Sequence, residues 1–207
     1  MAKNKGPVHT TPFGVAVYPR LNRPDTKFDE LGAYKADVRI PLEEARGLMT
    51  LLSKYFTDHA GKKPNATDNT MWTQETDEEG DKTGFVLFKL RVKNKMRRDG
   101  EIWDRKPKLF DASGRPCPSV NPWGGSTIAV NFEVYCWDTG SKTGVSLQPM
   151  AVQIKELVQG GGDGAAGDYG FGKEEGFSAD EAVPAGGDDG YGDMDRDGGS
   201  FDDDEDF

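Results

Sequence analysis

With 207 residues, 35% of them hydrophobic and 27 of them glycine, the chain can build one hydrophobic core and one further segment that does not fold. Its two cysteines, Cys117 and Cys136, are not spaced like metal ligands, which favours a reducing compartment over a disulfide-rich secreted scaffold. No stretch is apolar for long enough to span a bilayer, and the N-terminus lacks the apolar segment of a signal peptide. We therefore expect a soluble intracellular protein with no membrane partner.

The net charge of −10 is distributed unevenly along the chain. Residues 160–207 hold 16 of the 36 acidic residues and 2 of the 26 basic ones, a charge of about −14, whereas residues 1–159 carry 24 basic and 20 acidic residues, about +4. The sequence therefore predicts three parts: a flexible basic arm (1–11), a folded domain (12–159) and a disordered Gly/Asp-rich acidic tail (160–207).

Two strands open the folded domain. Residues 13–18 (FGVAVY) predict a first strand ended by Pro19, and residues 20–31 predict a loop. Residues 34–40 alternate between apolar and polar side chains, which predicts a second strand with one buried face.

An amphipathic helix follows the second strand. Pro41 suits the first turn of a helix, and apolar residues then recur at steps of three and four as far as Phe56. Gly61 and Pro64 end the helix. Its apolar stripe is typical of a core-facing helix rather than of a partner-docking one.

The next stretch, residues 62–84, is polar and acidic, and predicts a surface loop anchored by Met71 and Trp72. Residues 85–98 (FVLFKLRVKNKMRR) then predict a strand with Val86, Phe88, Leu90 and Val92 on its inner face. The outer face carries cations alone: Lys89, Arg91, Lys93 and Lys95, continued by Arg97 and Arg98. Lysines that protect a sheet edge would explain this pattern, and so would a binding face for a polyanion such as nucleic acid.

Further candidate ligands for a polyanion follow in Trp103, Lys106 and Lys108, before a turn at residues 111–114 (DASG). Residues 127–137 predict another strand, whose outer face carries Tyr135 and Trp137. These two rings could cover a small second core or a dimer contact, or they could stack on bases. Periodicity does not fix the direction of Trp103 or of Trp123, which lie in irregular segments.

The folded domain closes with a hairpin turn at residues 138–144 and a last strand at 145–157, where Pro149 indicates a bulge or an edge. About five strands with one helix inserted between the second and third predict a mainly β fold, specifically an OB-fold, a five-stranded Greek-key barrel. Exposed rings beside exposed cations on such a barrel are what single-stranded nucleic acid requires. A duplex reader would instead present a helix to a groove, and this helix begins with acidic residues.

The chain resembles the single-stranded-DNA-binding proteins of podoviruses, the short-tailed phages that encode their own replication machinery. The motifs that carry the resemblance are the opening MAK, GAYKADVRIP (32–41), GGSTIAV (124–130), YCWD (135–138), the strand that ends in KEL (155–157), the glycine-rich exit, and the acidic ending DDDEDF. Trp123 departs from the family's pattern, because an aliphatic side chain is expected near that loop, and the loop between helix and strand is shorter here.

The resemblance implies a non-enzymatic OB-fold protein, often a homodimer, that coats single-stranded DNA without sequence preference during phage replication and recombination in the cytoplasm of the infected bacterium. It implies that the acidic tail occupies the DNA cleft when DNA is absent, and that the tail and its terminal aromatic dock on the phage DNA polymerase and helicase–primase. Tyr135 falls at a stacking position, and Lys3 and the basic strand fall in regions of cationic contact. The partner-binding end of the tail is then Asp202, Asp203, Asp204, Glu205, Asp206 and Phe207.

Other functions have less support. A structural or chaperone-like β-protein with a DNA-mimicking tail is the alternative, but it would need no cationic aromatic face. DMDRDG (193–198) copies the start of a calcium loop, without the usual Glu at its twelfth position and without flanking helices. His9 and His59 belong to no catalytic cluster, and we expect neither a metal ion nor a cofactor.

Overall fold

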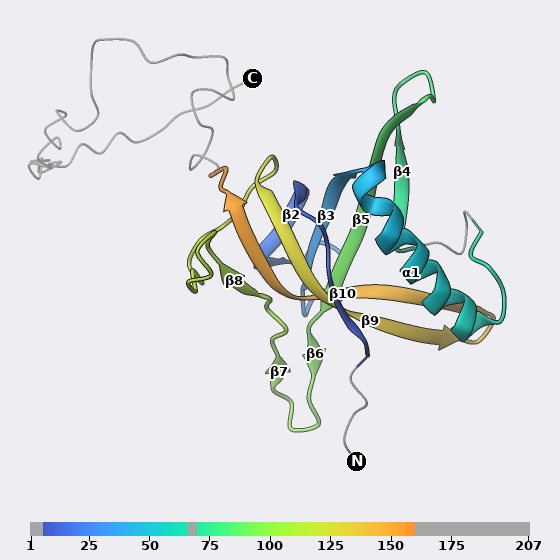
Figure 1. Cartoon of the computed structure of the whole chain (residues 1–207). Helices are drawn as coiled ribbons and strands as arrows, with labels where there is room; N and C mark the ends of the chain where they lie inside the picture. Colours follow the sequence, from blue (N-terminus) through green and yellow to red (C-terminus); the bar gives the residue numbers. More distant parts are fainter. Residues whose placement is uncertain (1–5, 66–69, 160–207) are drawn as a thin grey trace, which may run out of the picture. The chain divides into compact units, whose positions relative to one another are not determined.

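The computed structural model describes residues 6–65 and 70–159, and Figure 1 shows the arrangement of its elements. Along the chain these elements are β1 (Val8–Thr10), β2 (Gly14–Asp25), β3 (Ala33–Pro41), α1 (Leu42–Ala60), β4 (Trp72–Thr76), β5 (Lys82–Lys93), β6 (Lys95–Met96), β7 (Ile102–Trp103), β8 (Lys108–Phe110), β9 (Thr127–Thr139) and β10 (Lys142–Glu156). The arm residues 1–5 and the tail residues 160–207 lie outside the described residues, and with them Lys3, the DMDRDG stretch and the acidic ending.

Five strands close into a barrel. β2, β3, β5, β10 and β9 follow one another around it, and the pairing of β9 with β10 and with β2 completes the circle. β5 and β10 pair in parallel at Leu147 and Leu90, whereas the other neighbours in the barrel are antiparallel. This order is that of an OB-fold, and it confirms the predicted fold class. β1, β4 and β8 extend the sheet from β9, β5 and β10.

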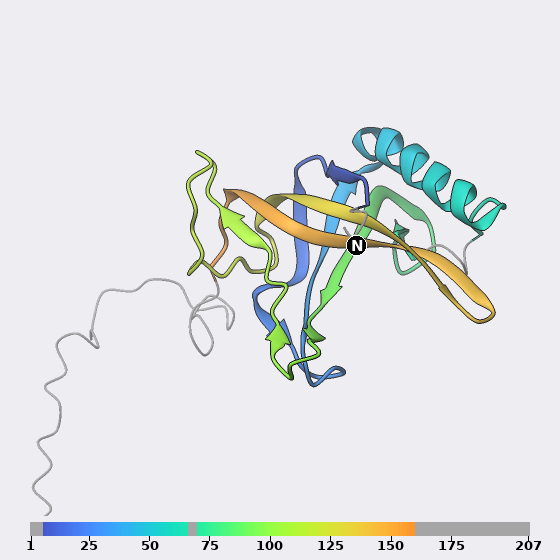
Figure 2. The same ribbon diagram turned by 90° about the horizontal axis from the view of Figure 1, so that it is seen from below.

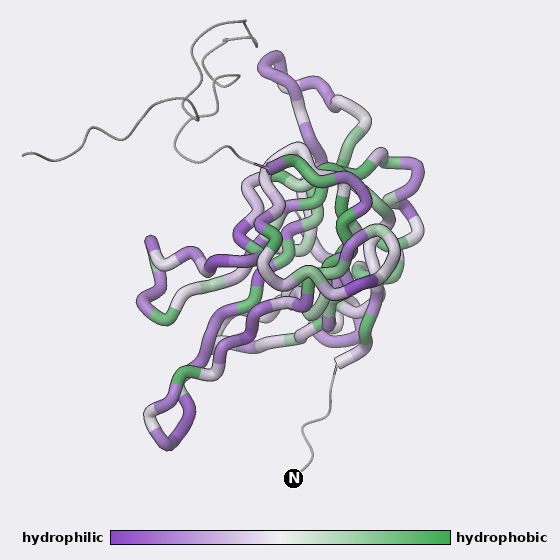
Figure 3. The backbone as a smooth tube through the Cα atoms, turned by 90° about the vertical axis from the view of Figure 1, so that its left-hand side faces the viewer, coloured by the Kyte–Doolittle hydropathy of each residue, from purple (hydrophilic) through white to green (hydrophobic). Residues whose placement is uncertain are grey.

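The core follows the alternation of the strands. Val86, Phe88, Leu90 and Val92, the predicted inner face of β5, are all buried. α1 packs on the barrel through the buried side chains of its stripe, Ala45, Leu52 and Phe56. Figure 3 shows the hydrophobic positions gathered in the barrel, and hydrophilic ones along the hairpins that protrude from it.

The predicted C-terminal end of α1 is confirmed, whereas Pro41, expected in the first turn, is the last residue of β3. Pro41 precedes the first residue of α1, and Gly61 follows the last with a left-handed φ of 68°, donating its N–H to the carbonyl oxygen of Thr57 at 2.9 Å. The described part of the chain holds no helix with both the length and the apolar character needed to cross a bilayer.

Two predicted loops were wrong in part. β2 does not end at Pro19 but continues to Asp25, with register shifts against β3 that accommodate its two prolines. Residues 72–76, predicted within a loop, form β4 and pair with β5. The predicted anchor is partly confirmed, because Met71 is fully buried. The bulge predicted at Pro149 is present between Pro149 and Ala151.

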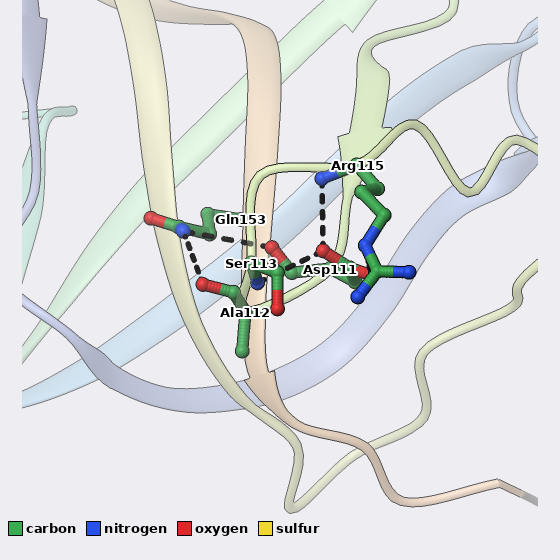
Figure 4. Close-up of polar contacts among 5 residues, drawn as sticks. All are labelled: Asp111, Ala112, Ser113, Arg115 and Gln153. Atoms are coloured by element: carbon green, nitrogen blue, oxygen red, sulfur yellow. Dashed lines mark hydrogen bonds and ion pairs between the residues drawn. The ribbon is translucent and has the colours of Figure 1, made fainter.

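The predicted turn at residues 111–114 is held by its own aspartate (Figure 4). Oδ1 of Asp111 accepts hydrogen bonds from the backbone N–H groups of Ser113 at 2.9 Å and Arg115 at 2.8 Å. Gln153 of β10 donates to the carbonyl oxygen of Ala112 at 3.1 Å, which ties this turn to the barrel.

Candidate nucleic-acid interface

A cleft of about 410 Å³ opens over β5, β10 and β9. Six residues predicted as DNA ligands meet in it: Lys89, Arg91, Lys93, Lys95, Tyr135 and Trp137. Its other lining residues are Thr70, Arg105, Ser146, Leu147 and Gln148.

The barrel order explains why residues so far apart in sequence converge. The pairing of Leu147 with Leu90 places β10 beside β5, and Tyr135 lies opposite Ser146 on the other side of β10. The cations of β5 and the rings of β9 therefore face the same cleft from its two walls. Among the described residues, Lys89, Arg91 and Lys95 form no ion pair, whereas Lys93 pairs with Asp29 at 2.8 Å. Unpaired cations keep the cleft positively charged and attract an anionic ligand.

Tyr135 offers a ring to solvent, with 47% of its surface exposed. It lies on the outer face of β9, as its position in the alternating pattern predicts. An exposed ring on a regular strand has its backbone already ordered, so little conformational entropy is lost when a base stacks on it.

Trp137 is held more tightly than Tyr135. Its indole Nε1 donates a hydrogen bond to Oγ of Ser146 at 2.9 Å. Its ring lies over Gly144, where an added Cβ would come within 2.3 Å of the Cζ2 atom of Trp137. The absence of a side chain at Gly144 thus leaves space for the ring to lie across β10 and form part of the cleft wall.

We expect Gly144→Ala to displace the Trp137 ring and to lower the stability of the domain by about 1–3 kcal/mol, the usual cost of overpacking. The near-ultraviolet circular dichroism of the tryptophans and urea unfolding measure the two effects. Gly47→Ala is the matched control, because a Cβ on Gly47 meets no atom within 4 Å and alanine favours the helix. An unchanged tryptophan spectrum in Gly144→Ala would contradict this account of the cleft wall.

Arg105 is the cleft cation that the sequence patterns missed. Its Nη2 donates to Oε1 of Gln148 at 2.6 Å, and its backbone N–H donates to Oδ1 of Asn94 at 2.9 Å. Asn94 is itself buried, and its Nδ2 donates to the carbonyl oxygen of Leu31 at 2.9 Å. Burial lowers the pKa of Arg105, but a guanidinium still carries its charge at neutral pH. The one sequence feature that could have identified Arg105 is its position two residues after Trp103. The segment has no periodicity from which the direction of its side chain could be predicted.

Trp103 adjoins the cleft through Arg105. It lies on β7, in the small hairpin that β6 and β7 form, and the Arg105 guanidinium carbon is 5.2 Å from the centre of its ring. Arg97 and Arg98 lie exposed in the same hairpin, where Arg97 forms an ion pair with Glu101 at 3.6 Å. These three residues extend the cationic aromatic surface beyond the cleft itself.

The structure does not bring Lys106 and Lys108 to the cleft. Both line a separate, mainly apolar pocket with Pro107, Leu109, Phe110, Pro116 and Pro118. The Lys106 ammonium donates to the side-chain oxygen of Asn22 and to the carbonyl oxygen of Pro118. The Lys106 ammonium thus binds groups within the domain and does not face the cleft. Lys3 and the tail residues 202–207 lie outside the described residues.

Asp37 is a carboxylate that lies beside two of the cleft cations, Lys89 and Arg91. Asp37 lines a smaller pocket of about 280 Å³ together with Lys35, Lys89 and Arg91. Burial raises the pKa of Asp37, and the charges of Lys89 and Lys35 act in the opposite direction. Its negative charge opposes the approach of a phosphate to Lys89 and Arg91.

Asp37→Asn should therefore tighten the binding of an anionic ligand by about 1 kcal/mol, roughly fivefold, the interaction of two unit charges about 4 Å apart in water. It should also stabilise the domain at neutral pH. The Asp37 carboxyl has a higher pKa in the folded state than in the unfolded state, so the unfolded state loses its proton first as pH rises. The free energy of unfolding therefore decreases between the unfolded-state pKa and the folded-state pKa. Urea unfolding across that pH range should show this decline in the wild type and not in the variant. Glu78→Gln, in the exposed turn after β4, is the control, and an equal gain in both variants would contradict a local effect.

The geometry is that of an OB-fold with a cleft built from cations and aromatic rings. No protein-family model matches the sequence, and no curated protein sequence matches it. Solved structures do match the fold, and single-stranded DNA-binding proteins of phages are among them, as the resemblance implied.

One of these structures is gp2.5, a single-stranded DNA-binding protein encoded by bacteriophage T7, with 20% identity and a TM-score of 0.61 over 80% of this chain and 98% of that one. Another is the C-terminally truncated single-stranded DNA-binding protein of bacteriophage Enc34, with 9% identity and a TM-score of 0.56 over 73% of this chain and 87% of that one. The Enc34 protein in complex with single-stranded DNA matches with 10% identity and a TM-score of 0.55, over 76% and 98%. At these identities the likeness shows that the chain has their fold.

Proposed function

We propose that the chain binds single-stranded DNA without sequence preference, and that it does so without catalysing a reaction. The observation that carries the proposal is the convergence of Lys89, Arg91, Arg105, Tyr135 and Trp137 in one open cleft. Rings can stack on any base, and lysine or arginine can contact any phosphate, so the arrangement selects an unpaired strand rather than a sequence.

A single strand fits this surface better than a duplex does. Bases in a duplex are stacked on one another and do not present their faces to Tyr135 or Trp137. The helix α1 is poorly suited to a groove, because Leu52 and Phe56 pack its apolar face against the barrel and its first turn carries Glu43 and Glu44. The names of the structural neighbours add independent support for single-stranded DNA as the ligand.

A competition experiment tests the ligand class. A fluorescent single-stranded oligonucleotide is bound to the full chain at low salt, and unlabelled single-stranded and double-stranded DNA of equal length are added in turn. The proposal expects displacement by the single strand at much lower concentration than by the duplex, and similar displacement by single strands of different sequence. Equal displacement by the duplex would overturn the preference for a single strand.

We place this activity in the replication and recombination of phage DNA, in the cytoplasm of the infected bacterium. In this proposal the acidic tail, residues 160–207 with a charge of about −14, competes with DNA for the basic cleft. Because the tail is tethered, its local concentration is high even if each contact is weak. The tail would recruit the phage DNA polymerase and helicase–primase through Asp202–Phe207, and the chain would act as a homodimer.

Shortening the chain to residues 1–159 tests the role of the tail. The proposal expects tighter DNA binding by the shortened chain, and loss of its association with the polymerase and helicase–primase. Equal DNA affinity of the two chains would show that the tail does not compete with DNA. The tail would then serve only to bind protein partners. Sedimentation of both chains measures the oligomeric state. A monomer at all concentrations would contradict the proposed homodimer.

A further inference from the structure

A second pair of exposed rings lies outside the cleft. Tyr18 and Trp123 line a groove of about 560 Å³ between β2 and the loop that precedes β9. Tyr18 is 83% exposed and Trp123 is 49% exposed. Neither ring belongs to the cleft described above, and Tyr and Trp side chains are enriched at binding surfaces.

The backbone of β2 turns Tyr18 outward at a cost. Ala16 is buried, so strict alternation would also point Tyr18 into the core, yet the next buried residue is Leu21. The register against β3 shifts between Val17 and Arg20, and this bulge reverses the face that Tyr18 occupies. Tyr18 has a φ of +47°, the only positive φ of a non-glycine residue in residues 6–65 and 70–159. Left-handed backbone is unfavourable for a bulky residue, and such strain gathers at binding sites.

Trp123 is fixed beside β2 by backbone hydrogen bonds. Its N–H donates to the carbonyl oxygen of Val158 at 3.0 Å, and its own carbonyl oxygen accepts from the N–H of Ser126 at 3.1 Å. The N–H of Gly125 donates to the carbonyl oxygen of Ala16 at 3.0 Å, and the N–H of Ala16 donates to the carbonyl oxygen of Ser126 at 2.8 Å. Gly125 has a φ of +90°, which glycine adopts without strain. The loop therefore presents the Trp123 ring from an ordered backbone.

The two binding surfaces are continuous through Tyr18. Besides its groove with Trp123, Tyr18 lines the smaller pocket that contains Asp37 together with the three cations Lys35, Lys89 and Arg91. Lys89 and Arg91 also line the cleft with Tyr135 and Trp137. β3 lies between β2 and β5 in the barrel, so the path from the cleft to Tyr18 crosses one strand (Figure 2). Arg20, exposed beside Tyr18, supplies a cation at the far end.

We propose that Tyr18 and Trp123 form a second base-stacking platform, which takes the part of a DNA strand that leaves the cleft across Lys89 and Arg91. This inference rests on the proposed single-stranded DNA binding and extends its path over β3 to β2. Rings at both ends of a row of cations are the arrangement that a continuous strand requires, because bases stack while phosphates track the charges. Short oligonucleotides would occupy the cleft alone, and longer ones would also reach the platform.

Oligonucleotides of increasing length separate the platform from the cleft. The full chain is compared with Tyr18→Asn and Trp123→Leu. Asparagine tolerates left-handed backbone, so Tyr18→Asn removes the ring and keeps the bulge. We expect wild-type affinity of both variants for the shortest oligonucleotides that bind, and a loss of roughly 5- to 100-fold for long ones. Tyr18→Phe should retain the affinity for long oligonucleotides, because the ring remains. Phe13→Leu is the control, since Phe13 is an exposed ring at the start of the same region that lines neither surface.

Photo-crosslinking gives a readout that does not depend on affinity. Long oligonucleotides that carry a halogenated uracil should crosslink to peptides containing Tyr18 or Trp123, and short ones should not. Wild-type affinity of both variants for long DNA, together with no crosslink to either residue, would overturn the platform and leave the cleft intact. Failure of the wild-type chain to bind any oligonucleotide would instead overturn the proposed function itself.

Discussion

Tyr135→Ala is expected to weaken the binding of single-stranded DNA by about 1–3 kcal/mol, which corresponds to roughly a 5- to 100-fold higher Kd. Tyr135 is the more exposed of the two rings in the cleft. Within the described residues its hydroxyl forms no hydrogen bond, so the loss of the side chain leaves no partner unsatisfied. Its removal should therefore take away a stacking surface while the barrel remains folded. Fluorescence anisotropy of a labelled oligonucleotide measures the Kd.

The conservative variant Tyr135→Phe distinguishes stacking from hydrogen bonding. Phenylalanine keeps the ring and removes the hydroxyl, so it should bind with nearly the affinity of the wild type. Urea unfolding of Tyr135→Ala should show a stability close to that of the wild type, because the side chain lies on the outer face of β9. A Tyr135→Ala chain that is folded and binds as the wild type does would show that this ring does not stack on bases.

Salt should weaken binding steeply. Each phosphate contact contributes a slope of about −0.7 to log K against log salt for a single strand, so five cleft cations in contact give a slope near −3.5. Affinity would then fall by about 3,000-fold for a tenfold rise in salt. Substituting both Lys89 and Arg91 with alanine should reduce the steepness of the slope by about 1.4. Titrations at several salt concentrations measure it.

The matched control for this experiment lies on α1, where Arg46 and Lys54 are also exposed cations. Substituting both with alanine removes the same net charge from a surface outside the cleft. If the two double variants lost the same share of the slope, the salt dependence would reflect the overall charge of the domain, and the cleft would not be the phosphate-binding surface.

The patterns that predicted the direction of side chains correctly were those of regular strands. On β5 the side chains of Phe88 and Leu90 enter the core, so those of Lys89 and Arg91 must point outward. The same reasoning placed Tyr135 on the outer face of β9. A strand paired on both sides keeps its alternation over many residues, and the face of each side chain can therefore be predicted from sequence.

The patterns failed where alternation is interrupted. Pro19 indicated the end of a strand and Pro24 a loop, whereas bulges let β2 continue past both prolines to Asp25. The same irregularity exposes Tyr18, which a period of two would bury. β4 has a polar sequence, WTQET, and its identity as a strand comes from pairing with the N-terminal part of β5, which local sequence does not encode.

The segment between β7 and β8 shows a third kind of failure. Arg105, Lys106 and Lys108 are close in sequence, but their directions are set by single contacts rather than by a period. Asn94 and Gln148 hold Arg105 in the cleft, whereas Asn22 and Pro118 hold Lys106 away from it. Such contacts join residues up to 84 positions apart, so composition identified the cations without identifying which of them share a surface.

The most direct test of DNA binding in the cleft is a titration of intrinsic tryptophan fluorescence with a single-stranded oligonucleotide, for the full chain and for residues 1–159, at several salt concentrations. Trp137 forms part of the cleft wall, so a base stacked there should quench its emission. We predict saturable quenching, with binding that weakens as salt rises and tightens when the tail is removed. Absence of both quenching and binding for the two chains at low salt would contradict this prediction.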